Sequence, residues 1–105
     1  MFIHNETINV DESINEQWLT WMHDVNIPAI LETGKFVNIK VCHVLVEEDM
    51  GGITYAVQYT AANKEDLQDF ITKESYKFKE AEMKLFSGKY GTFATQLKVI
   101  SEINK

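Results

Sequence analysis

The order of strand-like and helix-like patterns is the feature that most constrains how this chain folds. Some stretches place apolar residues at every second position, as strands do, and others repeat them every three to four positions, as helices do. The patterns follow the order strand, helix, strand, strand, helix, strand. A chain of 105 residues can bury one hydrophobic core, so we expect one domain over residues 1–105.

The first strand is predicted over Phe2–Val10, with its even positions facing the core. Two of these positions carry polar side chains, His4 and Glu6, about 7 Å apart along the strand. Burial would raise the pKa of the Glu6 carboxyl and suit it to general acid or base catalysis. The alternatives are a strand end exposed to water and a hydrogen-bonded structural pair.

The first helix is predicted after Asp11 or Ser13, either of which can cap it, and Ser13 with Glu16 forms a capping-box pattern. Its apolar residues recur at helical spacing: Ile14, Trp18, Trp21, Met22 and Val25. Pro28 disfavours helical geometry at the residue before it, so we expect a kink or a new turn there. Gly34 is expected to end the second helical piece.

Residues 36–47 predict a long strand that is apolar on both faces. One face carries Val37, Ile39, Val41, His43 and Leu45, and the other carries Phe36, Cys42, Val44 and Val46. Either a bulge exchanges the faces midway, or both faces are covered. Residues 49–52 predict a hairpin turn. Residues 53–60 predict the returning strand, which directs one set of side chains to one side: Ile53, Tyr55, Val57 and Tyr59.

A second helix is predicted from Thr60 or Asn63, with apolar residues near a 3.6-residue repeat. They are Leu67, Phe70, Ile71, Phe78, Ala81 and Leu85. The repeat weakens over residues 73–76, which predicts a break or an irregular turn. The last strand is predicted over residues 92–100, with Phe93, Leu97 and Val99 on one face.

This order predicts an α+β fold, the ferredoxin-like βαββαβ plait. The hairpin joins the second and third strands, and right-handed crossovers bring the first and third strands side by side. The expected result is a four-stranded antiparallel sheet with two helices on one face.

Four stretches resemble a known family: INVDESINEQWLTWM, IPAILETGKF, VLVEEDMGGITYAVQYTA and AEMKLFSGKYGTFATQL. The most specific part is W-x-x-W-M followed by I-P-x-x-L-x-T-G-x-F. The family comprises short bacterial proteins with a domain of unknown function, grouped with the dimeric α/β barrels. The resemblance implies a ferredoxin-like subunit and a homodimer, and it implies no particular reaction.

Two positions depart from that family's pattern. Relatives often carry His where this chain has Asn26, and Arg where it has Ala94. If those two residues form a catalytic pair in the relatives, this chain has lost it, which weakens the case for an enzyme.

The two tryptophans are candidates for the wall of a ligand pocket. Trp18, Trp21 and Met22 would line a cavity between helix and sheet, with Tyr55 and Tyr59 beneath them. The alternative is core packing, since each aromatic ring buries about 150–250 Å². Related dimeric α/β barrels bind small aromatic or quinone-like substrates at this place, so the resemblance implies a small hydrophobic or aromatic ligand.

The histidines and the cysteine do not indicate a metal or thiolate site. Cys42 and His43 are adjacent in a strand and point to opposite faces. His43 meets Tyr59 only if the hairpin register allows it, and is otherwise a structural residue. His4, His23 and His43 lie on three elements, whereas a metal site needs three or four converging ligands. We therefore expect neither a metal nor a cofactor.

Charge and composition argue against other classes of function. The net charge is −6 and all ten basic residues are lysines, whereas nucleic-acid binding needs a positive patch and usually arginine. The lysines of the second helix alternate with Glu74, Glu80 and Glu82, which predicts a solvated face of mixed charge. The sequence contains no run of 18 apolar residues, so we expect no membrane span. A single cysteine is typical of a cytoplasmic protein.

Two functions fit these patterns. The first is a dimeric small-molecule-binding domain or cofactor-independent enzyme. Its pocket candidates are His4, Glu6, Trp18, Trp21, Met22, Asn26, His43, Tyr55 and Tyr59. The second is a non-enzymatic homodimerisation or protein-interaction module, suggested by the apolar second face of residues 36–46.

Overall fold

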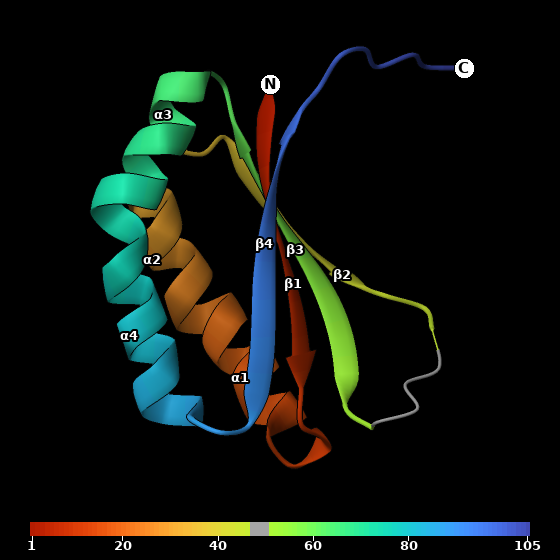
Figure 1. Ribbon diagram of the computed structural model, residues 1–105, viewed down its shortest axis with the longest axis vertical. Coiled ribbons are helices and arrows are strands. Elements are labelled where there is room, and N and C mark those ends of the chain that lie inside the picture. Colours follow the sequence, from red (N-terminus) through yellow and green to blue (C-terminus); the bar gives the residue numbers. More distant parts are fainter. Residues whose placement is uncertain (47–50) are drawn as a thin grey trace.

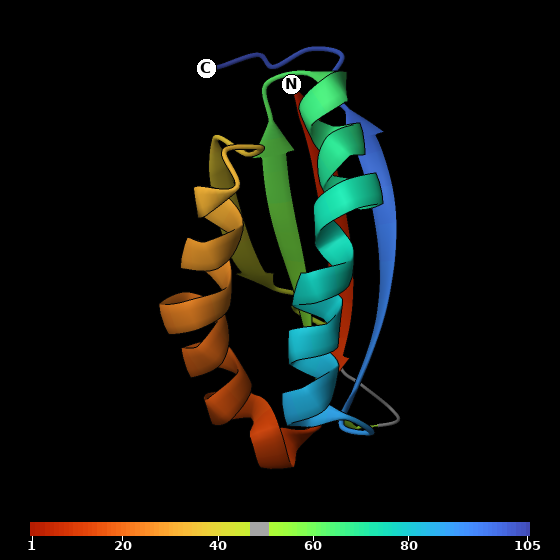
Figure 2. The same cartoon turned by 90° about the vertical axis from the view of Figure 1, so that its left-hand side faces the viewer.

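The computed structural model describes residues 1–46 and 51–105, and it contains one sheet covered by helices on one side (Figures 1 and 2). The strands are β1 (Phe2–Val10), β2 (Asn38–His43), β3 (Ile53–Ala61) and β4 (Tyr90–Lys98). The helices are α1 (Asn15–Trp21), α2 (Ile27–Glu32), α3 (Lys64–Asp69) and α4 (Ser75–Phe86). The strands pair in the order β2-β3-β1-β4, and every pair is antiparallel. The predicted ferredoxin-like plait is confirmed.

β1 lies at the centre of the sheet. It pairs with β3 so that His4 stands opposite Tyr59, and with β4 so that Glu6 stands opposite Ala94. Its even positions point toward the helices, as predicted. His4 is buried there and Glu6 is half-buried, so the central strand does direct two polar side chains inward.

The first helical arm, α1 and α2, contains a π-helical turn at Met22–Asn26, where the Ile27 N–H bonds to the Met22 carbonyl. A π turn holds one more residue than an α turn and shifts the phase of everything beyond it. The buried residues of this arm therefore stand four apart: Trp18, Met22, Asn26 and Ile30. The prediction that Val25 faces the core is wrong, because the turn rotates it outward and leaves it 56% exposed.

The caps and breaks of this arm follow the sequence. Asp11, one of the two predicted caps, accepts a hydrogen bond from the Ser13 backbone N–H at 3.0 Å. Pro28 lies at the start of α2, directly after the π turn, where its missing N–H is tolerated. Gly34 ends the arm with φ +75, as predicted.

The second helical arm, α3 and α4, repeats the same design. Asn63 caps it and accepts a hydrogen bond from the Asp66 N–H at 2.8 Å. The sequence predicts an irregular turn over residues 73–76, and the structure has a π turn at Phe70–Glu74, which begins three residues earlier. Beyond it, Glu82 and Phe86 face the core. The expectation that Ala81 and Leu85 do so is wrong, because the extra residue shifts the phase of α4.

β2 is shorter than the predicted strand. Phe36 precedes it and packs in the core, with its ring centroid 4.7 Å from that of Phe70, so it does not share a face with Cys42. Cys42 stands opposite Ala56 and points to the open face of the sheet. The predicted hairpin turn includes residues 49 and 50, which lie outside the described residues.

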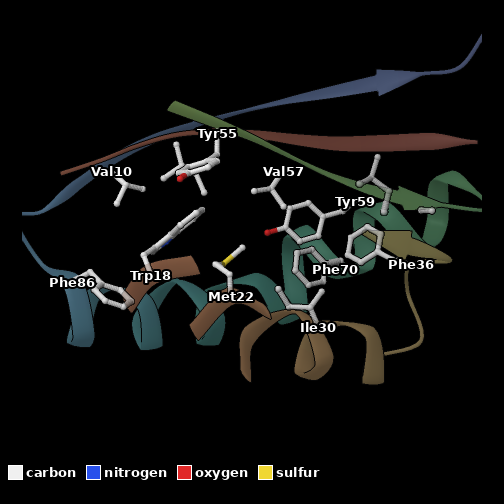
Figure 3. Packing of buried hydrophobic residues seen from close by; sticks show 13 residues of the cluster. Val10, Trp18, Met22, Ile30, Phe36, Tyr55, Val57, Tyr59, Phe70 and Phe86 are labelled. Atoms are coloured by element: carbon white, nitrogen blue, oxygen red, sulfur yellow. The ribbon is translucent and has the colours of Figure 1, made fainter. Parts of the chain in front are cut away.

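The core fills the space between the sheet and the two arms (Figure 3). Trp18 is fully buried and stacks on Tyr55, with ring centroids 5.1 Å apart. Trp21 is half-buried and packs its edge against Phe86. None of the helices in the described residues has the length and hydropathy that crossing a bilayer requires.

Candidate functional site

A small cavity lies between the sheet and the two helical arms, beside Tyr59. Its volume is about 30 Å³, which is room for one or two water molecules. Its apolar wall consists of Ile30, Phe70 and Phe78. Its polar wall consists of His4, Glu6, Asn26, Tyr59, Ser75, Lys79 and Glu82. The cavity therefore gathers ionisable groups from β1, β3 and α4 in one space.

Glu6 is the central titratable group of this cavity. The pKa of its carboxyl is raised to about 7, first by burial and then by the charge of Glu82. The charge of Lys79 and hydrogen bonds from the hydroxyls of Thr92 and Tyr59 act in the opposite direction. Because this pKa lies near neutral pH, Glu6 can both release and accept a proton there.

Tyr59 is a hydrogen-bond donor to Glu6. Its own pKa lies well above the usual value, first through burial and then through the negative charges of Glu6 and Glu82. The phenol therefore keeps its proton across the physiological range.

Glu82 is the second carboxyl of the cavity and is only 6% exposed. The Trp18 indole N–H donates to its Oε2 at 2.9 Å. Burial raises the Glu82 pKa, and the bond from Trp18 lowers it. The sequence predicts a solvated Glu82, and this prediction is wrong because of the phase shift in α4. Its position between Phe78 and Phe86, four residues from each, is the signal that would have placed it inside.

His4 is buried and neutral. Its Nδ1 accepts a hydrogen bond from the Gln96 amide at 2.8 Å, so the neutral ring carries its proton on Nε2. Burial, assisted by the charge of Lys79, lowers the His4 pKa to about 4. The ring lies 5.4 Å from that of Tyr59.

Asn26 enters the cavity from the end of the first π turn. It is buried, and its amide donates to the sulfur of Met22 at 3.3 Å. Ala94 stands opposite Glu6 across β1 and β4. The two positions where the family resemblance leads us to expect His and Arg therefore both adjoin the Glu6 site, and this chain fills both with uncharged side chains.

Four of the nine predicted pocket residues line the cavity: His4, Glu6, Asn26 and Tyr59. Trp18 reaches it through the hydrogen bond to Glu82, and Met22 through Asn26. The remaining three, Trp21, Tyr55 and His43, lie elsewhere. Tyr55 donates its hydroxyl proton to Asn15, and His43 lies next to Tyr55 with ring centroids 5.6 Å apart.

The suggested contact between His43 and Tyr59 does not form. The β2–β3 register places Ile39 opposite Tyr59 and His43 opposite Tyr55, the last pair of these two strands. His43 is exposed there. Among residues 1–46 and 51–105, no cluster of three or more His, Cys, Asp or Glu side chains has the geometry to hold a metal ion.

Solved structures place this fold in a well-populated class. A dimeric ferredoxin-like protein from an uncultured marine organism has a TM-score of 0.75 over 97% of both chains, at 9% identity. A variant of MhuD with two manganese protoporphyrin IX molecules bound per active site has a TM-score of 0.70 over 100% of both chains, at 13% identity. HapK from Hahella chejuensis has a TM-score of 0.67 over 100% of this chain and 99% of its own, at 11% identity. At such identities the likeness defines the fold class alone.

The chain itself belongs to a family described as a domain of unknown function, DUF4286, whose pattern matches residues 1–100. This bears out the resemblance seen in the sequence. No curated protein matches the chain.

Proposed function

We propose that this protein binds a small organic molecule at the Glu6 cavity and exchanges a proton with it through the Glu6 carboxyl. The observation that carries the proposal is the half-buried Glu6 carboxyl, which has a pKa of about 7 and is held by Tyr59 at a cavity. In this reaction the carboxylate takes a proton from an acidic C–H or O–H group, and the ligand becomes an anion. Lys79 in the cavity wall offsets that charge.

The walls of the cavity favour a ligand with an aromatic or otherwise apolar body. The rings of Tyr59, Phe70 and His4 lie within 6.2 Å of one another, centroid to centroid. The present volume of about 30 Å³ accepts water only, so a ligand has to displace water and separate the helical arms. Such a molecule is small, with one polar group directed at Glu6.

The protein acts as a homodimer in this proposal. The face of the sheet opposite the helices is bare, and it carries Phe93 and Leu97 on β4, with Phe93 66% exposed. Apolar side chains on an open sheet face are typical of an interface, and a dimeric protein is among those with this fold. A second copy covering this face would complete a second layer behind β1.

Ligand binding is tested by thermal shift with a set of phenols, naphthols and small aromatic acids. Ligands at ten times their Kd should raise the Tm by about 5 °C or more. The Glu6→Gln variant should lose this shift, while Glu80→Gln, an exposed glutamate of the same protein, should keep it. Equal shifts in wild type and Glu6→Gln would refute a role for the carboxyl.

A second candidate is a homodimerisation or protein-interaction module without a ligand, favoured by the same open face. Analytical ultracentrifugation separates the two. We expect Phe93→Lys to produce monomers at micromolar concentration, and Tyr76→Lys, an exposed aromatic residue on α4, to remain dimeric. A wild-type dimer whose Tm no ligand raises would favour the interaction module. A wild-type protein that is a monomer would exclude the homodimerisation module.

A further inference from the structure

Glu6 and Glu82 come from different elements, β1 and α4, and line the same cavity of about 30 Å³. Two ionised carboxylates in so small a space repel each other strongly, so such a pair retains one proton over a wide pH range. The titratable groups that face the pair from the surrounding elements are Tyr59, Lys79, His4 and, on β4, Tyr90, whose pKa is raised by burial and then by the charges of both glutamates. His4 is neutral, which leaves Lys79 as the one positive charge among the lining residues described.

The hydrogen-bond partners of the two carboxyls differ in kind. Glu82 meets the Trp18 indole N–H, which can donate and cannot accept. Glu6 meets the hydroxyls of Tyr59 and Thr92, which can do both. A proton on Glu6 can therefore be accommodated by rotation of a hydroxyl, whereas the donor beside Glu82 favours the ionised form.

We infer that Glu82 is a positioning residue for Glu6: the Trp18 indole holds Glu82 in the ionised form, and the proton shared by the two carboxyls rests on Glu6. This inference rests on the proposed role of Glu6 in proton exchange and says how the chain prepares it. The directions of the pKa shifts agree. Burial raises the pKa of both carboxyls, and beyond this the charge of Glu82 raises that of Glu6 while the bond from Trp18 lowers that of Glu82.

The inference is tested on the ligand-free protein by carbon-13 NMR titration of the glutamate side-chain carboxyls, with Glu6 assigned by its loss in Glu6→Gln. In wild type the Glu6 midpoint should lie near pH 7. In Glu82→Gln it should fall by about one pH unit, because the repelling charge is gone. Glu80→Gln should leave it unchanged.

Trp18→Phe provides the second arm, because it removes the indole N–H and keeps an aromatic ring. Glu82 should then titrate at higher pH than in wild type, and Glu6 at lower pH, so that the proton moves from one carboxyl to the other. Trp21→Phe, which removes a tryptophan outside the cavity, should change neither midpoint. Circular dichroism shows whether each variant is folded.

An unchanged Glu6 midpoint in both Glu82→Gln and Trp18→Phe would overturn the inference, as would a wild-type Glu6 that titrates near pH 4.5. Neither result depends on a ligand. If the midpoints shift as expected and Glu6→Gln still binds every ligand, the inference stands and the proposed function fails. If Glu6→Gln loses binding and the midpoints do not shift, the reverse holds.

Discussion

Tyr55 and Tyr59 lie four residues apart on the same face of β3 and are both buried, yet they do different things. Tyr55 stands opposite Ile8 and stacks on Trp18, in what we call the packing end (Val10, Trp18, Tyr55 and Phe86). Tyr59 stands opposite His4 and donates to Glu6, in the cavity end (His4, Glu6, Tyr59 and Glu82). The ionisable residues of β1, rather than the tyrosines, determine which end of the core can exchange protons.

The largest difference between the ends should appear in stability after truncation at the packing end. Trp18→Ala removes a fully buried ring and is expected to lower the free energy of unfolding by about 3–5 kcal/mol. Trp21→Ala removes a half-buried ring and should lower it by roughly half as much. Urea denaturation followed by circular dichroism measures both, and equal losses would mean that the two rings are packed alike.

The pH dependence of the free energy of unfolding should come mainly from the cavity end, which contains Glu6 and His4. Folding raises the Glu6 pKa from 4.5 to about 7, so the folded state holds this proton more tightly and stability falls as pH rises through that window. Folding lowers the His4 pKa from 6.5 to about 4, so stability falls as pH drops through that window. Each effect amounts to roughly 3 kcal/mol at most, and in wild type they oppose each other between pH 4.5 and 6.5.

Single substitutions should uncover the two opposing slopes. Glu6→Gln leaves the His4 effect, opposed only by that of Glu82, so its stability should rise more steeply with pH between about 4 and 6.5 than that of wild type. His4→Gln leaves the Glu6 effect, and its stability should fall between about 4.5 and 7, with Glu82 adding in the same direction. Urea denaturation over this pH range measures both. Parallel profiles for the two variants would contradict the pKa assignments, and Glu80→Gln should match wild type.

The smallest expected effect is the one that comes from removing the hydroxyl of either tyrosine. Tyr59→Phe removes a hydrogen bond to the ionised Glu6, so the Glu6 midpoint should move to higher pH. Tyr55→Phe removes only the bond to Asn15 and should leave that midpoint in place. Each should lower the free energy of unfolding by about 1 kcal/mol. A Glu6 midpoint that moves equally in both variants would show that the ends are coupled.

The sheet could be predicted from the sequence. Which helical residues point toward the core could be predicted only in part. Alternation in β1 places His4 and Glu6 inward, because a strand keeps a period of two without interruption. The helical pattern assumes 3.6 residues per turn, and each arm departs from this once. The regular period therefore predicts Val25 inside, whereas the prediction of a solvated Glu82 comes from the alternation of lysines and glutamates along the second helix.

The candidate site could be predicted as far as its strand residues. His4, Glu6 and Tyr59 follow from period two and from the pairing of β1 with β3. Glu82 is missed because its charge and the alternating lysines of the helix predict a solvated face, although its spacing of four residues from Phe78 and from Phe86 indicates the core side. The sequence does not determine the partner of His43, because the hairpin register depends on a turn whose length the apolar pattern does not define.

The two π turns carry a consequence for how such a site can change. In each arm, which residues face the cavity depends on how many residues the π turn contains as well as on their chemistry. Deleting one residue between Met22 and Asn26 would rotate the following helix by about 100° and bring a different side chain against Glu6, with every other residue kept. A single insertion or deletion could thus convert a polar wall to an apolar one, a route to new ligands that requires no substitution at the site.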